Sequence, residues 1–127
     1  MTHAKQYLIA RIESYYDAVD RLDTEAIVTH FTPDAVMEVP TGGVRHAGLE
    51  AIRATYDRRA AEVEKSFHGD FTHVIDAEEG RGTTRLTARR TVTGGQTIEM
   101  DCIALFAFEG ELIKNIVIWM SGENSLK

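Results

Sequence analysis

The apolar residues near the start of the chain recur at helical spacing. They occupy the i, i+4, i+7, i+8 and i+11 positions of an amphipathic helix: Leu8, Ile12, Tyr15, Tyr16 and Val19. Residues 25–31 predict a second, short helix, with Asp23 or Thr24 as its N-cap and the cluster at 32–34 as its stop signal. A third helix is predicted over residues 49–63, where apolar residues return at similar spacing.

The remaining segments alternate between apolar and polar residues, which is typical of β-strands. Residues 35–40 form the first such run, and the turn signal at 41–43 sends the chain back. Four further runs follow the third helix and are separated by glycine-containing turns: residues 71–77, 83–93, 96–108 and 111–120. This order predicts a single α+β domain over residues 1–127, with helices packed on one face of a curved sheet.

Composition and charge narrow the class of protein. Hydrophobic residues make up 43% of the chain and charged residues 27%, which are ordinary values for a globular domain. The net charge of −6 disfavours nucleic acid as a partner, because phosphate binding needs a concentrated basic surface. No apolar run is long enough to form a signal core or to cross a membrane. We therefore expect a cytoplasmic protein with no nucleic-acid or membrane partner.

The sequence offers little support for a metal or a cofactor. Cys102 is the only cysteine, so neither an internal disulfide nor a cysteine metal cluster can form. No pair of histidines falls on one face together with a carboxylate as third ligand, which disfavours a metal site. No glycine-rich phosphate loop follows a strand, which disfavours a nucleotide. We expect neither metal nor cofactor.

Four segments carry a family pattern and together cover most of the chain: residues 15–39, 46–56, 66–75 and 103–116. They resemble the nuclear-transport-factor-2-like superfamily, and most closely its SnoaL-like branch, which includes ketosteroid isomerases, scytalone dehydratase and hexachlorocyclohexane dehydrochlorinase. The resemblance implies a cone-shaped fold, in which three N-terminal helices pack on a strongly curved mixed or antiparallel sheet around an apolar pocket. It also implies a homodimer. The reaction stays open, because this fold hosts isomerases, dehydratases, cyclases, hydrolases and binders.

Two tyrosines lie at positions where a hydroxyl can reach the interior. Tyr15 is near the centre of the first helix's apolar face, and Tyr56 is on the apolar face of the third helix. A buried tyrosine needs a partner for its hydroxyl, so the two can bond to each other. The resemblance to ketosteroid isomerases implies that Tyr15 donates to a developing oxyanion and that Tyr56 supports it. Two core aromatics with satisfied hydroxyls are the alternative.

The carboxylates of the isomerases are absent. The resemblance matches their positions to Val39 and Ala104, while Glu38 and Asp101 have the opposite strand parity. This argues against steroid isomerisation by that mechanism. Ala104 also disfavours a polyketide-cyclase mechanism that uses an acid at that position.

The dehydratase and dehydrochlorinase relatives match better. The resemblance aligns Asp20 with their aspartate, which orients a proton-abstracting histidine, and His68 with that histidine. An imidazole with a pKa near 6.5 suits a general base at neutral pH, and a carboxylate on its other nitrogen fixes the tautomer. The alternatives are a solvated Asp20 at the helix end and an exposed loop His68. His73 is a second candidate base, whereas His30 and His46 are expected at the surface.

Strand parity predicts which side chains face inward. Arg90 shares the inward parity of its strand and can anchor an acidic substrate there, unless a register shift places it in water near Glu99 or Asp101. We expect these residues to bind substrate: Tyr56, Val39, Met37, Arg90, Met100, Ala104, Ile116 and Met120. Trp119 falls on the outer parity beside Ile103, which favours a dimer surface there.

The sequence therefore predicts a small, cofactor-independent enzyme for an apolar, cyclic, polyketide- or terpenoid-like molecule. It would act by proton abstraction with elimination, as a lyase or dehydratase, or with isomerisation. His68 is the predicted base, Asp20 orients it, and Tyr15 donates to the oxyanion. The alternative is a non-catalytic ligand-binding or dimerisation domain of the same fold.

Overall fold

Helices and strands follow one another in the order α1, α2, β1, β2, α3, β3, β4, β5, β6. The structure is a computed structural model that describes residues 2–127. Its helices have these bounds: α1 (Thr2–Asp20), α2 (Thr24–Val28) and α3 (Leu49–Glu62). Its strands have the following bounds: β1 (Phe31–Val39), β2 (Val44–Ala47), β3 (Val63–Asp76), β4 (Arg81–Val92), β5 (Thr97–Glu109) and β6 (Leu112–Met120).

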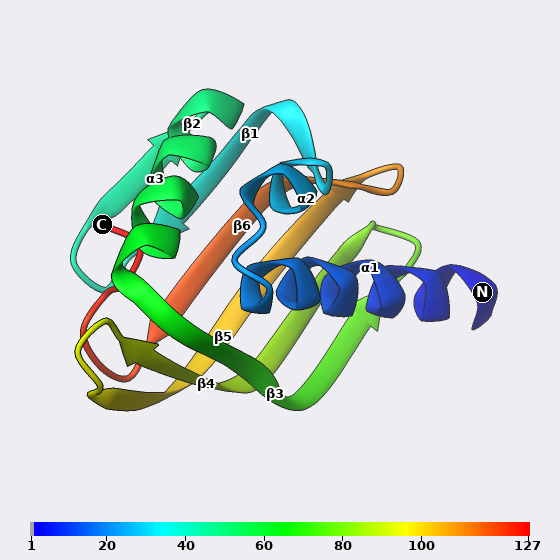
Figure 1. Ribbon diagram of the computed structural model, residues 1–127. Coiled ribbons are helices and arrows are strands. Elements are labelled where there is room, and N and C mark those ends of the chain that lie inside the picture. Colours follow the sequence, from blue (N-terminus) through cyan, green and yellow to red (C-terminus); the bar gives the residue numbers. More distant parts are fainter. Residues whose placement is uncertain (1) are drawn as a thin grey trace.

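The six strands form one sheet in the order β2-β1-β6-β5-β4-β3. All neighbours pair antiparallel except β1 and β6, which run parallel. The sheet curls without closing, and α1 and α3 lie on the same face of it, inside the curl (Figure 1). The predicted α+β class, with helices on a strongly curved mixed sheet, is confirmed. None of the helices in the described part of the chain is long and apolar enough to span a membrane.

The core fills the space between α1 and the inner face of the sheet. The predicted apolar face of α1 is buried, and each of its members is at most 6% exposed: Leu8, Ile12, Tyr15, Tyr16 and Val19. Opposite lie the inward residues of β5 and β6, which are also buried as their parity predicts: Met100, Cys102, Ala104, Phe106, Ile116 and Ile118. Burial of such apolar side chains is the main contribution to folding free energy.

The end of α1 fixes the position of Asp20. Leu22 adopts a left-handed backbone conformation (φ 56°), and the amide of Asp23 donates to the carbonyl of Ala18 at 3.2 Å, which is the pattern of a Schellman C-cap. Asp23 then caps α2, because its side chain accepts from the amide of Ala26 at 3.1 Å. Asp23 is thus confirmed as the N-cap, and Asp20 stands on the last turn of α1.

Three predicted boundaries are wrong, the first being the end of α2, which lies at Val28 rather than at residue 31. Strand β3 begins at Val63 rather than at residue 71, and β1 begins at Phe31, so residues 32–34 belong to a strand instead of stopping α2 in a loop. Both segments are irregular. The pairing of β3 shifts register between Gly69 and Thr72, and that of β1 with β6 shifts after Phe31. A bulge interrupts the alternation of apolar and polar residues that identifies a strand in the sequence.

Candidate active site

Asp20 on α1 and His68 on β3 meet in a direct hydrogen bond. The His68 imidazole Nδ1 lies 2.6 Å from Asp20 Oδ1, and the His68 backbone amide donates to Asp20 Oδ2 at 2.8 Å. The long β3 strand makes this contact possible, because its first half runs alongside the end of α1. The distance is that of a charge-assisted hydrogen bond, so the pair has the geometry that the predicted dyad requires.

Two further residues support the carboxylate of Asp20. The hydroxyl of Ser66, two residues before His68 on β3, donates to Asp20 Oδ1 at 2.9 Å. Arg59 of α3 donates to the Ser66 oxygen at 3.2 Å. The carboxylate therefore accepts three hydrogen bonds and is linked through Ser66 to a guanidinium. Such second-layer contacts hold a catalytic carboxylate in one orientation.

The tautomer and plane of the His68 ring are both set by its neighbours. A carboxylate can only accept hydrogen bonds, so Nδ1 carries the proton that it donates to Asp20, and Nε2 keeps its lone pair. The ring of Tyr16 stacks on the imidazole, with a centroid distance of 5.0 Å and an interplanar angle of 27°. Nε2 is therefore the basic atom of a ring that is held from two sides.

Burial and hydrogen bonding shift the pKa values of the pair in the same direction. Burial lowers the pKa of His68 below its ordinary value, and the hydrogen bond and charge of Asp20, which raise it, do not offset this. Burial raises the pKa of Asp20, but the hydrogen bonds from His68 and Ser66 and the charge of His68 outweigh it, so this pKa is lowered. Desolvation therefore dominates for His68, although the carboxylate of Asp20 acts to raise its pKa. At neutral pH the pair is a carboxylate and a neutral imidazole.

Replacing Asp20 by Asn should lower the pKa of His68 further. The carboxylate is the main group that raises this pKa against burial, and Asn removes its charge while keeping its shape. Titration of the His68 ring protons by NMR should give a midpoint below 6.5 in the wild type and a lower one in Asp20→Asn. Asp17→Asn, on the exposed side of α1, should leave the midpoint unchanged. A higher midpoint in Asp20→Asn would contradict the assignment.

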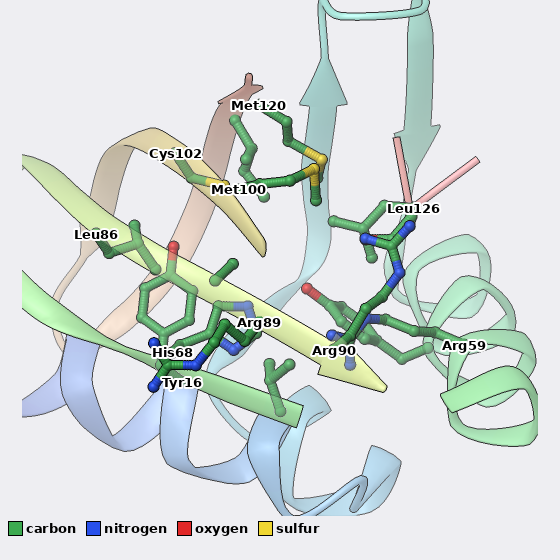
Figure 2. Close-up of a pocket in the computed structure, with 15 residues that line it drawn as sticks. Tyr16, Arg59, His68, Leu86, Arg89, Arg90, Met100, Cys102, Met120 and Leu126 are labelled. Atoms are coloured by element: carbon green, nitrogen blue, oxygen red, sulfur yellow. The ribbon is translucent and has the colours of Figure 1, made fainter. Parts of the chain in front are cut away.

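His68 lines a cavity that is enclosed by the helices and the inner face of the sheet. Its volume is about 30 Å³, enough for roughly two water molecules. Tyr16 and His68 lie at one end of it and Arg59 with Leu126 at the other (Figure 2). The wall between them is mostly apolar and includes these residues: Leu86, Ala88, Met100, Cys102, Ile118 and Met120. Methionine side chains adapt their shape, so Met100 and Met120 can enlarge this space for a ligand.

The last residues of the chain close one side of the cavity. Leu126 is 5% exposed and lines the cavity. Its carbonyl accepts a hydrogen bond from His46 Nε2 at 2.6 Å, and the carbonyl of Lys127 accepts one from Thr55 Oγ1 at 3.0 Å. The segment is therefore held by β2 and α3, and Leu126 is the apolar part of it that faces inward.

Two tyrosines line the cavity, and a third lies behind one of them. Tyr15 and Tyr56 are hydrogen-bonded through their hydroxyls, as expected from their helix faces, but only Tyr56 lines the cavity. Tyr16 lines it too, and its hydroxyl bonds to none of the residues that the structure describes. Burial raises the pKa of Tyr15 and of Tyr16 well above the ordinary value and that of Tyr56 to about 12. All three are neutral donors at physiological pH.

The predicted binding residues divide into two groups. Tyr56, Arg90, Met100 and Met120 line the cavity. The other four are fully buried in the core and are not among the residues that line it: Met37, Val39, Ala104 and Ile116. The inward parity of Arg90 is confirmed, since this side chain is only 8% exposed. Asp101 lies on the outer face and pairs with Arg85 at 2.6 Å, which confirms its opposite parity.

The remaining histidines serve other contacts. His73 does not line the cavity, and its ring bonds to Thr84 Oγ1 and to a Glu13 carboxylate oxygen, each at 2.8 Å. The surface position predicted for His30 is wrong: it is 5% exposed and bonds to Ser14 and to the Ala26 carbonyl. His46 is half-buried rather than exposed. Within the part of the chain that the structure describes, no three potential metal ligands cluster.

Tyr16, Arg59, Ser66 and Leu126 are the site residues that the sequence did not reveal. Tyr16 is four positions before Asp20, which places both on one side of α1, and this spacing could have identified it. Arg59 follows Tyr56 by three positions on α3, so the same argument applies there. Ser66 shares the strand parity of His68. The position of Leu126 depends on the path of the last segment and has no comparable signal.

The outer face of the sheet carries exposed apolar residues. Trp119 is 42% exposed and Ile103, its partner across β5 and β6, is 43% exposed. Leu105 on the same strand is 39% exposed. The outward parity of Trp119 is confirmed, and the dimer that it favours stays a prediction.

Analytical ultracentrifugation should detect a dimer that Trp119→Lys disrupts, because a charge in the centre of an apolar interface is costly.

The chain is similar to known proteins in both sequence profile and fold. The profile of the family described as SnoaL-like domain matches residues 12–116. A comparison with curated protein sequences finds no match.

Among solved structures, the BvnE pinacolase of Penicillium brevicompactum has 13% identity and a TM-score of 0.83, over 95% of this chain and 87% of its own. A candidate polyketide cyclase from Xanthomonas campestris pv. campestris has 18% identity and a TM-score of 0.81, over 91% of each chain. A protein from Catenulispora acidiphila with a ketosteroid isomerase-like fold, in complex with trimethylamine, has 16% identity and a TM-score of 0.79, over 91% of this chain and 88% of its own. These matches confirm the predicted fold and family resemblance.

Proposed function

Because the chain belongs to the SnoaL-like domain family, we propose that it is a small, cofactor-independent enzyme that removes a proton from a carbon atom of an apolar, cyclic molecule. The observation that carries this proposal is the 2.6 Å hydrogen bond between His68 Nδ1 and Asp20 in the wall of an apolar cavity. It leaves Nε2 as a neutral base beside the space that a substrate would occupy. The solved structures that the chain resembles include enzymes of small-molecule chemistry, which agrees with this class.

The proposed reaction begins when His68 Nε2 takes a proton from a carbon next to a carbonyl group. The electron pair of the broken C–H bond moves into the carbonyl and forms an enolate oxyanion. The imidazolium formed is stabilised by Asp20, which keeps its negative charge. The enolate then either takes the proton back at another carbon, which is isomerisation, or expels a leaving group from the β-carbon, which is elimination.

A tyrosine hydroxyl stabilises the oxyanion in this proposal. Tyr56 and Tyr16 are placed for this role because both line the cavity as neutral donors. Donors that are fixed before charge develops are worth more than mobile water. Tyr15 acts through Tyr56, to which it is hydrogen-bonded. This reverses the order of the two residues that the ketosteroid isomerases imply.

Isotope exchange tests the proposal without knowledge of the natural substrate. A set of cyclic ketones and enones is incubated with the protein in D₂O, and the loss of α-protons is followed by NMR. The wild type should accelerate exchange for at least one compound, and His68→Gln, with a folded-protein spectrum, should not. Exchange at the same rate in His68→Gln would remove the base from the proposal.

The pH profile of the exchange rate provides a second test. The rate should rise with pH through a midpoint below 6.5 and then become constant, because the neutral imidazole is active and burial lowers the pKa of His68.

A second candidate is a ligand-binding domain of the same fold. The small volume of the cavity, about 30 Å³, favours it, as do the apolar Val39 and Ala104 at positions where isomerase relatives carry acids. In the same experiment this candidate predicts ligand-induced shifts in the protein spectrum without any exchange of ligand protons.

A further inference from the structure

Two arginines are buried in the wall of the cavity. Arg59 of α3 is 5% exposed and Arg90 of β4 is 8% exposed. Both line the cavity that contains His68, and both also line a more open hollow on its other side, whose volume is about 350 Å³. In Figure 2 they lie close together at the end of the cavity away from Tyr16 and His68. The pair thus separates an apolar interior from a hollow that reaches solvent.

The positive charge of this pair is not balanced by the protein. Arg59 donates to Ser66, which links it to Asp20, whereas the guanidinium of Arg90, whose backbone pairs within the sheet, has no hydrogen bond or ion pair with the residues that the structure describes. Glu62 and Glu123 line the outer hollow, but they are exposed and form no ion pair with either arginine. Since His68 is neutral, two cations face one carboxylate. The Arg90 side chain is largely buried, and its guanidinium borders the outer hollow without a carboxylate partner, so it is available to bind an anion.

We propose that Arg59 and Arg90 bind the carboxylate of the substrate, which is therefore an apolar cyclic acid rather than a neutral molecule. This assignment rests on the proposed function, because it places the acid group at the arginine end of the cavity and the reacting carbon at His68. Most of the other residues in the cavity wall are apolar, which fits a hydrocarbon body between the two ends.

The chemistry of the pair favours a carboxylate as the group bound. Guanidinium groups present planar, paired donors that match the two oxygens of a carboxylate. Burial lowers the pKa of Arg59, and the positive charge of Arg90 lowers it as well. The two cations therefore repel each other, and an anion between them relieves that repulsion. The charge also raises the local concentration of anions at the hollow, through which the acid can enter.

Binding of benzoate and benzamide tests this assignment, because the two molecules have the same shape and differ in charge. Titrations are followed by ¹H–¹⁵N NMR for the wild type, for Arg90→Met and for Arg85→Met. Arg85 is the matched control, since it lies on β4 but on the outer face, where it pairs with Asp101. The wild type should bind benzoate at least about tenfold more tightly than benzamide, as charge-assisted hydrogen bonds predict. Arg90→Met should abolish the preference and Arg85→Met should keep it.

Three results would overturn the assignment. They are equal affinity of the wild type for the two probes, no saturable binding of benzoate, and a preference for benzoate that survives in Arg90→Met. Arg59→Met provides a second loss-of-charge variant, and the dispersion of each spectrum reports whether the variant is folded.

His68→Gln separates this assignment from the proposed reaction. It should lose isotope exchange and keep the preference for benzoate, since His68 does not bind the acid group. Exchange without the preference would indicate a neutral substrate, which contradicts the acid assignment alone. If the wild type prefers benzoate but catalyses no isotope exchange, the proposed reaction is contradicted and the acid assignment stands. The protein would then be an acid-binding domain.

Discussion

Asp20→Asn should reduce the rate of proton abstraction by a factor of roughly 10³, within the range that general-base catalysis supplies. The carboxylate accepts the proton of His68 Nδ1 at 2.6 Å and so fixes which nitrogen is basic. An asparagine amide can present its NH₂ group to Nδ1 instead, and the ring then holds its proton on Nε2. The substituted protein also loses the charge that stabilises the imidazolium. Both effects act on the transition state, so kcat should fall more than the affinity for substrate.

The matched control is Asp17→Asn on the same helix. Asp17 lies on the exposed side of α1 and pairs with Arg21 at 3.0 Å, and such surface pairs contribute little. Its substitution should leave the exchange rate within twofold, as expected for about 0.4 kcal/mol or less. Rates are compared by isotope exchange on the compound that the wild type uses best. A rate in Asp20→Asn close to that of Asp17→Asn would mean that Asp20 only holds β3 against α1.

The fold could be predicted because its elements carry their own patterns. The apolar face of α1 and the alternation in β4, β5 and β6 each determine what lies inside. The start of β3 could not be predicted in this way. Its first half crosses the end of α1 and then bulges near Asp70, whose backbone is left-handed (φ 55°). The conformation of those residues depends on their contacts with α1, which is distant in sequence, and their sequence does not show the alternation of a strand.

Only part of the candidate active site could be predicted from the sequence. Asp20 and His68 are 48 positions apart, and only the resemblance to known enzymes linked them before the structure did. Ser66 supports Asp20 from the same strand as His68, and Arg59 acts on Ser66 from α3, so the site joins three elements that no local pattern links. Residue type alone was misleading for His30, which is buried because Ser14 and the Ala26 carbonyl satisfy both of its ring nitrogens.

Periodicity alone cannot tell which of two neighbouring tyrosines on α1 faces the cavity, because the answer depends on how the helix is rotated about its axis. Tyr15 and Tyr16 both belong to the apolar face of α1, about 100° apart around the helix axis. The structure directs Tyr15 toward Tyr56 and the core, and Tyr16 toward His68 and the cavity. Tyr15 is therefore linked to the cavity only through its hydrogen bond to Tyr56.

Arg90→Met should make the protein more stable while removing its preference for an acid. The free energy of unfolding should rise by about 1–2 kcal/mol, because the substitution replaces a largely buried side chain, whose guanidinium has no partner among the described residues, with an apolar side chain of similar length. For a chain of this size the corresponding rise in Tm is roughly 4–7 °C. Thermal unfolding followed by circular dichroism, without added anions, measures this change.

Benzoate provides the complementary measurement. It should raise the Tm of the wild type, since a ligand that binds only the folded state stabilises it, and it should not raise that of Arg90→Met. Arg85→Met, which removes an exposed cation, should change the free energy of unfolding by less than about 0.5 kcal/mol. A loss of stability in Arg90→Met would show that the guanidinium is already satisfied in the free protein. A gain would identify Arg90 as a residue kept at a cost to folding, as binding sites commonly require, and would place its partner outside the chain.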